Sequence, residues 1–182
     1  MNIGKTFYPK SRKEWRSWLL KNYKTEKEIW LIHYNKASGK YSLPYDDAVE
    51  EAMCFGWIDS SVKKLDEDGR AQRYTPRREK SLISELNKER LRRLVKKKKV
   101  MPEILTKIQT ELNKEFELPE SILNEIKKDK QAWENFQKFP KHYQVIRIAF
   151  VEDARKRPEM FKQRLNYLLK MTSKNKKFGT LQ

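Results

Sequence analysis

The residues best suited to chemistry lie in two short stretches of the chain. The first runs from Cys54 to Ser61 and places Trp57 and Asp59 two positions apart, so that they share one face of a strand. The second combines paired arginines with polar residues that can start a helix: Arg77, Arg78, Ser81, Ser84 and Asn87. Guanidinium groups and the N–H groups of a helix N-terminus both bind anions. Together the stretches predict a site for a small anionic ligand, with Trp57 as an aromatic wall.

A structural interpretation of the same residues stays open. Asp59 can form an ion pair with Arg77 or Arg78 and so tie the strand to the following helix. Ion pairs of this kind occur at structural as well as functional positions.

Cysteine chemistry has weaker support. Cys54 is the only cysteine, and it could act as a nucleophile only if the fold placed it beside His33. We favour a small buried side chain at the end of a helix before Gly56. The chain has no G-x-S-x-G motif. We therefore assign no catalytic residues and favour a non-enzymatic protein, without excluding an enzyme.

Metal and nucleotide cofactors are not expected. Zinc sites need three or four ligands, whereas the chain offers only His33, His142 and one cysteine, all far apart in sequence. The five glycines match neither standard nucleotide-binding loop.

The charge predicts a different kind of partner. The 182 residues include 42 Lys+Arg and 25 Asp+Glu, for a net charge of +17. Residues 70–99 alone carry 13 basic and three acidic side chains, a density that attracts polyanions. A helix here would present a basic stripe opposite its apolar side: Lys88, Arg92, Lys96 and Lys99. This predicts nucleic-acid binding without sequence specificity, with a hairpin at 57–75 as a wing. The alternative is a solvated stripe that binds nothing.

The elements that must position these residues follow from capping and periodicity. Ser11 and Glu14 form a capping box before a helix, and residues 28–35 predict a central strand because both faces are apolar. Pro44 opens a helix that ends at Gly56. Residues 57–65 and 70–75 predict a β-hairpin.

The remainder of the chain predicts helices. After about residue 80, four prolines precede helical patterns: Pro102, Pro119, Pro140 and Pro158. Residues 172–182 have few apolar anchors and are expected to fray. The fold class is therefore α+β, with a small antiparallel sheet packed by helices in residues 1–99 and an all-helical region in residues 100–182.

A family resemblance extends over residues 10–172. The segments that carry it are Glu14–Leu19, Ile29–Leu31, Tyr45–Asp59, Thr75–Arg78 with Ser81, Ser84 and Asn87, and, in the helical part, Pro119 and Ala154–Glu159. They resemble the YdeI/OmpD-associated family, and Cys54–Asp59 is the most specific motif. The chain departs from the family pattern at Ile83, where a tryptophan is usual, at Met160–Phe161, where threonine and arginine are usual, and in the lysine run before Met101, which lacks the usual glycine.

The resemblance implies a soluble bacterial protein, linked by name to protection against bacteriocins and other cationic peptides and to an outer-membrane porin. It implies no known reaction. Because a +17 protein repels cationic peptides at long range, we expect any protective role to be indirect. A small anion, a nucleic acid or a protein are the partners that these features allow.

We expect a cytoplasmic location. The first 25 residues contain no apolar block of signal-peptide length, and the longest apolar run, Ile29–Ile32, is too short to span a membrane. A single cysteine fits a reducing compartment.

Overall fold

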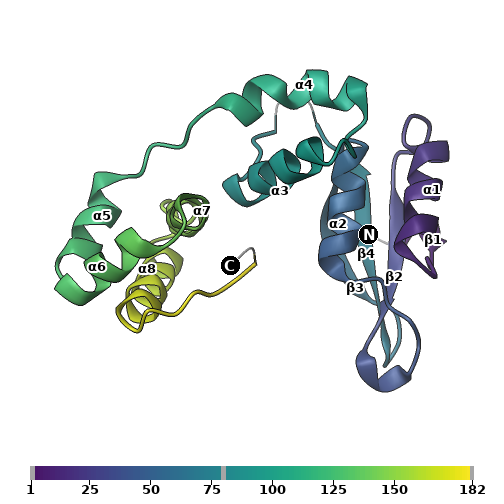
Figure 1. The fold of residues 1–182 in the computed structure, drawn as a ribbon. Helices are drawn as coiled ribbons and strands as arrows, with labels where there is room; N and C mark the ends of the chain where they lie inside the picture. The colour runs from purple at the N-terminus through teal and green to yellow at the C-terminus, as the bar shows by residue number, and fades with distance from the viewer. Residues whose placement is uncertain (1–2, 79–80, 181–182) are drawn as a thin grey trace. The chain divides into compact units, whose positions relative to one another are not determined.

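The computed structural model describes residues 3–78 and 81–180, and Figure 1 shows the course of the chain. Within these residues the chain forms a four-stranded mixed sheet in its N-terminal part and a succession of helices after it. The expected α+β class is confirmed. The sheet differs from an all-antiparallel one because the short strand β1 (Thr6–Phe7) pairs in parallel with β2 (Ile29–Tyr34).

The strand order is β1-β2-β4-β3, so β2 lies inside the sheet, as its two apolar faces predict. Strands β3 (Trp57–Lys64) and β4 (Gly69–Pro76) form the predicted hairpin, with an irregularity between Asp59 and Val62. Residues that lie directly opposite each other share a face of the sheet. On this basis Asp59, Tyr74 and Ile29 lie on one face.

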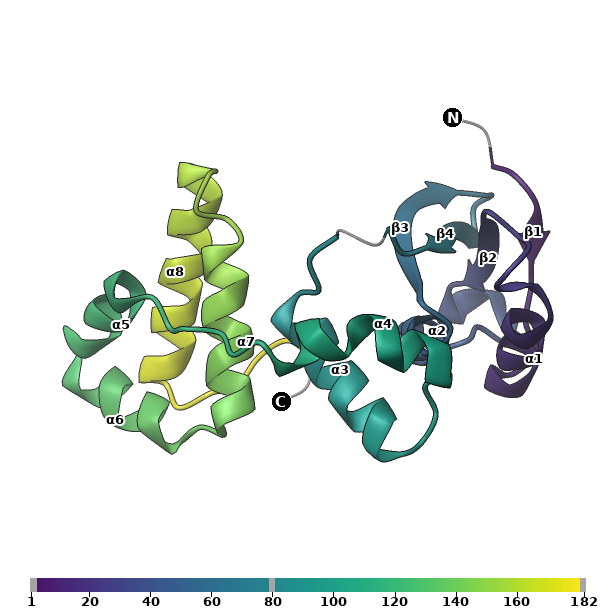
Figure 2. The ribbon, with the colours of Figure 1, turned by 90° about the horizontal axis from the view of Figure 1, so that it is seen from above.

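Helices α1 (Arg12–Asn22) and α2 (Tyr45–Cys54) lie on the same side of the sheet (Figure 2). The predicted cap of α1 is confirmed, since the Ser11 side chain accepts a hydrogen bond from the N–H of Glu14 at 3.1 Å. The indole of Trp15 is fully buried and donates a hydrogen bond to the carbonyl oxygen of Ala48 at 3.0 Å, which joins the two helices. A short 3₁₀ helix (Lys36–Ser38) follows β2.

Gly56 connects α2 to β3 in a conformation that other residues rarely adopt. Its φ is +72°, and a Cβ atom there would lie 2.9 Å from Cδ1 of Ile104. Ile104 belongs to α4 (Pro102–Asn113), whose start is held by a hydrogen bond from the Met101 N–H to the Cys54 carbonyl. The glycine therefore lets α4 approach the end of α2 closely.

The chain divides into two compact units. The first comprises Met1–Leu82 and Arg90–Leu112, and the second comprises Ile83–Glu89 and Asn113–Gln182. Helix α3 (Glu85–Lys96) contributes to both. The domain boundary expected between residues 99 and 100 falls between α3 and α4, within the first unit.

The second unit contains α5 (Glu120–Lys127), α6 (Lys130–Lys138), α7 (Lys141–Glu152) and α8 (Pro158–Ser173). Pro102, Pro119, Pro140 and Pro158 stand at or just before helix starts, as predicted. A separate apolar core fills the unit, and its most deeply buried members include Ile122, Ile126, Phe136, Tyr143 and Leu168.

The expectation that residues 172–182 fray is wrong for the part that is described. Helix α8 extends to Ser173, Thr172 is buried, and Phe178 packs against the core of the second unit. The Phe178 N–H donates to the Tyr143 hydroxyl oxygen at 3.1 Å, and Arg147 donates to the Thr180 carbonyl at 3.2 Å. One aromatic anchor and two hydrogen bonds thus order a tail whose composition alone indicates fraying.

Two kinds of feature, a membrane-spanning helix and a metal-binding cluster, are absent from the described part of the chain. No helix there is both long enough and apolar enough to cross a bilayer. No three His, Cys, Asp or Glu residues within it are grouped so as to hold a metal ion.

Candidate functional site

A group of polar residues lies on the sheet face that α1 and α2 cover. Asp59 on β3 stands opposite Tyr74 on β4, and Gln72 lies two positions before Tyr74 on the same face. Tyr45, the first residue of α2, reaches this face with its hydroxyl group. We call Tyr45, Asp59, Gln72, Tyr74 and Arg90 the sheet-face site; all five belong to the first unit.

The Asp59 carboxylate is at the centre of the sheet-face site. Its Oδ2 atom accepts hydrogen bonds from the Tyr45 hydroxyl at 2.8 Å and from the Gln72 amide at 3.4 Å. Its Oδ1 atom accepts none from the described residues, and no Lys or Arg among them forms an ion pair with Asp59. Two neutral donors are therefore its only hydrogen-bond partners within the described part of the chain.

Tyr74 is the most deeply buried member of the site. Its side chain is 0% exposed, yet its hydroxyl has no hydrogen-bond partner among the described residues. Burial, and next the charge of Asp59, raise the pKa of Tyr74 far above its usual range. A buried hydroxyl without a partner costs about 1–3 kcal/mol, and a hydrogen bond to a bound molecule would offset that cost.

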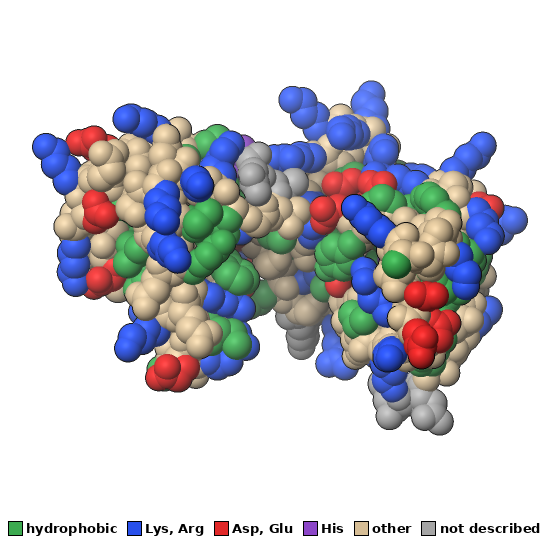
Figure 3. All heavy atoms as spheres, turned by 90° about the horizontal axis from the view of Figure 1, so that it is seen from below, with side chains coloured by type: hydrophobic (Ala, Val, Ile, Leu, Met, Phe, Trp, Pro, Cys, Tyr) green, Lys and Arg blue, Asp and Glu red, His purple; other side chains and the backbone are tan. Residues whose placement is uncertain are grey.

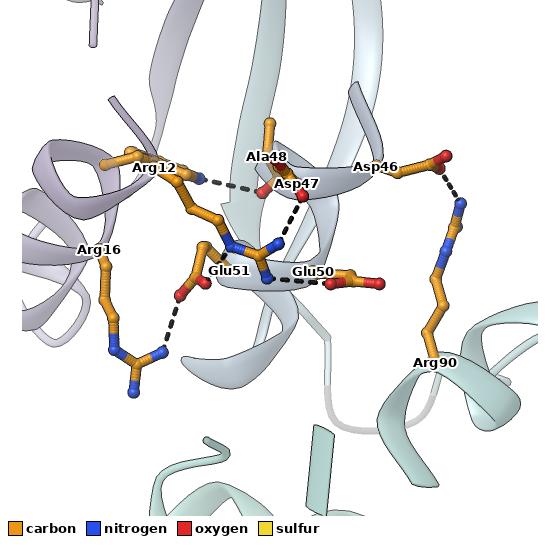
Figure 4. A network of polar contacts seen from close by, with 9 residues as sticks. Arg12, Arg16, Asp46, Asp47, Ala48, Glu50, Glu51 and Arg90 are labelled. Carbon is orange, nitrogen blue, oxygen red and sulfur yellow. Dashed lines mark hydrogen bonds and ion pairs between the residues drawn. The ribbon is translucent and has the colours of Figure 1, made fainter. Parts of the chain in front are cut away.

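Tyr45 and Arg90 complete the site from two helices. Partial burial and the hydrogen bond to Asp59 raise the pKa of Tyr45 to about 12, so its hydroxyl stays protonated and donates. Arg90 on α3 is 3% exposed and pairs with Asp46 in the first turn of α2 (Figure 4). Its positive charge acts on the hydroxyls of both Tyr45 and Tyr74 and offsets part of the rise in the pKa of each.

A second polar network holds α2 in place and is structural. Arg12 on α1 forms ion pairs with Asp47, Glu50 and Glu51 of α2 (Figure 4). Arg16 also pairs with Glu51, at 2.7 Å. Because Glu51 is only 2% exposed, these arginines neutralise a carboxylate that would otherwise be buried as an isolated charge.

The predicted aromatic wall is not open in this structure. Trp57 is 2% exposed, and its indole N–H donates to the Tyr23 carbonyl at 3.1 Å. Its ring packs edge-to-face against Trp18, with centroids 5.8 Å apart. Trp57 shares a face with Asp59, as predicted, but it belongs to the core because α1 covers that end of the sheet.

The arginines predicted to bind an anion interact with the backbone instead. Arg77 donates to the Ser81 carbonyl at 2.9 Å and to the Leu82 carbonyl, and burial lowers its pKa. Ser81 donates its hydroxyl proton to the Arg78 carbonyl at 2.7 Å, and Arg78 is exposed. These contacts join Arg77 and Arg78 to Ser81 and Leu82. The predicted alternative, an ion pair from Asp59 to Arg77 or Arg78, is also absent among the described contacts.

The other predicted ligand residues lie at the start of α3. Ser84 accepts a hydrogen bond from the Asn87 N–H at 3.4 Å, as a helix cap does. Both residues belong to the second unit, whereas Asp59, Arg77, Arg78 and Ser81 belong to the first. Only Asp59 of the predicted set is part of the sheet-face site.

The predicted basic stripe is shorter than its spacing indicates. Lys88 is 5% exposed and pairs with Glu85 at 2.9 Å, so it does not belong to an exposed surface. Arg92 and Lys96 are exposed, although Arg92 also donates to the Leu112 carbonyl at 2.8 Å. Lys99 is half-buried and follows the end of α3. Glu79 and Lys80, within the basic stretch 70–99, lie outside the described residues.

Basic side chains are nevertheless widespread at the surface. Figure 3 shows Lys and Arg side chains on the visible face of each unit, with acidic side chains in smaller groups between them. The predicted stripe is one part of this distribution, and four consecutive lysines, residues 96–99, start at the last residue of α3.

Cys54 and His33 are both buried, as the structural interpretation predicts. Burial raises the pKa of the Cys54 thiol to about 11, which disfavours the thiolate. The His33 ring bonds through Nδ1 to the Leu43 carbonyl at 3.1 Å, so Nδ1 carries the proton. No contact between Cys54 and His33 is found among the described residues.

Sequence reasoning missed Tyr45, Gln72, Tyr74 and Arg90 as site residues. One signal was available. Side chains alternate between the two faces of a strand, so Arg70, Gln72 and Tyr74 share one face of β4 and the buried Ala71 lies on the other. This alternation places the polar Gln72 on the same face as Tyr74, the face that α2 covers. The arrival of Arg90 from a distant helix left no local signal.

Comparison with known families assigns the two parts of the chain differently. Residues 7–107 match a family described as "Domain of unknown function (DUF8412)", and the match covers more than half of the chain. The chain belongs to this family. The entire sheet-face site lies within the matched DUF8412 residues.

Residues 115–175 match a second family, described as "Bacteriocin-protection, YdeI or OmpD-Associated". The resemblance to the YdeI/OmpD-associated family is thus confirmed for the helical part. The Cys54–Asp59 motif, which carries the resemblance in the N-terminal part, lies within the DUF8412 match. No curated protein and no solved structure matched the chain.

Proposed function

We propose that the protein is a non-enzymatic, cytoplasmic factor in protection against bacteriocins and other antimicrobial peptides. The match of residues 115–175 to a bacteriocin-protection family carries this proposal. The net charge of +17 favours an indirect action, because the chain repels cationic peptides at long range.

Deletion of the gene tests this role. The deletion strain should become more sensitive to several bacteriocins and to polymyxin-like peptides, and a plasmid copy should restore resistance. Unchanged sensitivity across the peptide set would contradict the proposal. Rescue by an Asp59→Asn copy would show that the role does not depend on the sheet-face site.

At the molecular level we propose that the first unit binds a small polar molecule at the sheet-face site. The carrying observation is the buried Tyr74 hydroxyl, which has no hydrogen-bond partner among the described residues and lies opposite the Asp59 carboxylate, whose Oδ1 atom accepts no bond from them. Convergent polar groups in a largely buried setting are typical of small-molecule sites. The raised pKa of Cys54 argues against this thiol as a nucleophile.

A fragment screen by ligand-observed NMR tests this binding. Polar fragments should bind to the full-length protein and lose binding to the Asp59→Ala variant. Asp153→Asn, an exposed carboxylate of the second unit, is the matched control and should leave binding unchanged. The proposal fails if no fragment distinguishes wild type from Asp59→Ala.

Nucleic-acid binding is a second candidate, because Arg92 and Lys96–Lys98 are exposed on one short stretch. Because Lys88 is buried, the three other members of the stripe, Arg92, Lys96 and Lys99, are the ones that can contact phosphates. The log–log dependence of duplex DNA affinity on salt should then have a slope of about −3. Replacing Arg92, Lys96 and Lys99 with glutamine should flatten it, while replacing Lys127, Lys128 and Lys130 in the second unit should not. Fluorescence anisotropy without binding at low salt would exclude this candidate.

A further inference from the structure

The local charge at the sheet-face site is opposite in sign to that of the whole protein. Among the described residues, three charged groups act on the Tyr45 hydroxyl: Asp59 and Asp46, each negative, and Arg90, which is positive. Two of these, Asp59 and Arg90, also act on the Tyr74 hydroxyl. Since Arg90 pairs with Asp46, the carboxylate of Asp59 is left with its negative charge in a protein of net charge +17.

The hydrogen-bonding capacity that remains at the site is mainly that of acceptors. Tyr45 has one hydroxyl proton and donates it to Asp59. The Gln72 amide has two N–H groups and donates them to Asp59 and to the Ser60 carbonyl, the latter at 3.2 Å. Asp59 Oδ1 accepts no bond from the described residues, and a hydroxyl oxygen such as that of Tyr74 can also accept.

A ligand suited to these acceptor atoms donates several hydrogen bonds and carries a positive charge. A protonated amine does both, because it has up to three N–H donors and a compact charge. An anion would instead meet the Asp59 carboxylate. The anionic ligand expected from Arg77 and Arg78 therefore does not suit the site that the fold builds.

We propose that the sheet-face site binds the protonated amine of a small molecule, with Asp59 as its counter-ion and the hydroxyl groups of Tyr45 and Tyr74 orienting its N–H donors. This inference rests on the proposed binding function of the first unit and names its ligand class. Hydrogen bonds to a charged group are the stronger ones, so Asp59 carries most of the affinity and Tyr74 a smaller share.

Three four-carbon probes that differ in one group separate the possibilities: butylammonium, 1-butanol and butyrate. Each is titrated into the ¹⁵N-labelled full chain at constant ionic strength, and the amide signals of Asp59 and Gln72 are followed. Butylammonium should give saturable shifts, whereas butanol and butyrate should give none. Asp59→Asn should weaken butylammonium binding about tenfold or more, and Tyr74→Phe should weaken it by about three- to tenfold.

Controls distinguish loss of the site from loss of the fold. Tyr74→Phe removes one oxygen atom that has no hydrogen-bond partner in the described part of the chain, so the melting temperature of the variant should be equal to or above that of wild type. Asp153→Asn should bind butylammonium as wild type does.

Two results would overturn the inference, and they have different consequences. Site-specific shifts with butyrate or butanol but not with butylammonium would refute the amine and leave the proposed binding function standing. An absence of shifts with all three probes, together with a fragment screen that finds no ligand dependent on Asp59, would remove both.

Discussion

Burial controls the reactivity of single residues in this protein. Cys54 is buried, and its pKa of about 11 leaves about one thiol in a thousand ionised at pH 8. We therefore expect iodoacetamide to alkylate the native protein far more slowly than the urea-unfolded protein, measured by intact mass over time. Comparable rates in the two states would show that Cys54 is accessible and would reopen its assignment as a nucleophile.

His33 gives a second prediction at this scale, on pH. Burial, and next the charge of Arg70, lower the pKa of the folded imidazole below its value near 6.5 in the unfolded chain. The unfolded state then binds more protons on acidification. The contribution of neutral His33 to stability is thus complete above about pH 6.5 and is lost as the pH falls below it, by at most about 1.4 kcal/mol per pH unit.

The variant His33→Asn isolates this effect, because asparagine keeps a side-chain N–H for the Leu43 carbonyl and does not titrate. Urea unfolding at several pH values between about 5 and 8 should show the free energy of unfolding of wild type falling toward that of the variant on acidification. Parallel curves for the two proteins would contradict the prediction.

At the scale of elements, ion pairs between α1 and α2 stabilise the packing of the two helices on the sheet. Arg12 contacts three carboxylates of α2, and one of them, Glu51, is 2% exposed. Arg12→Gln should lower the free energy of unfolding by about 2 kcal/mol, since Arg16 still pairs with Glu51. Chemical denaturation measures this loss.

Two further variants test the cause. Lys13→Gln removes a neighbouring exposed charge and should change stability by no more than about 0.5 kcal/mol. Adding Glu51→Gln to Arg12→Gln should cost less than the sum of the two single changes, because the carboxylate that needs the arginine is gone. Equal effects of Arg12→Gln and Lys13→Gln would refute the role of the network.

At the scale of the whole molecule, each unit has its own core, so we expect the two units to unfold independently. Phe136 is 2% exposed in the core of the second unit, so Phe136→Ala should destabilise that unit by about 3–5 kcal/mol. Hydrogen exchange with mass spectrometry should show faster exchange in peptides from residues 113–180 and little change in those from residues 3–78.

The reverse experiment uses a residue of the first unit. Leu19 is fully buried there, and Leu19→Ala should accelerate exchange in residues 3–78 while residues 113–180 keep their protection. If either substitution accelerated exchange equally throughout the chain, the two units would form one cooperative folding unit.

The sequence by itself determined the elements, because their signals are local. Ser11 caps a helix three residues from Glu14, apolar residues on both faces place Ile29–Tyr34 inside a sheet, and prolines stand at helix starts. Each of these patterns depends on neighbours within a few positions, and so does the α+β class derived from them.

Tertiary structure alone decided which side chains meet. Tyr45 reaches Asp59 across 14 positions, and Arg90 reaches Asp46 across 44. The spacing of Lys88 predicts an exposed position in the stripe, yet its side chain is buried. Hydrogen bonding and desolvation depend on the distances between residues in space. The periodicity of a helix or strand gives no information on these distances for residues far apart in the sequence. For that reason the elements were predictable, whereas the sheet-face site became visible only once the sheet and its covering helices had been built.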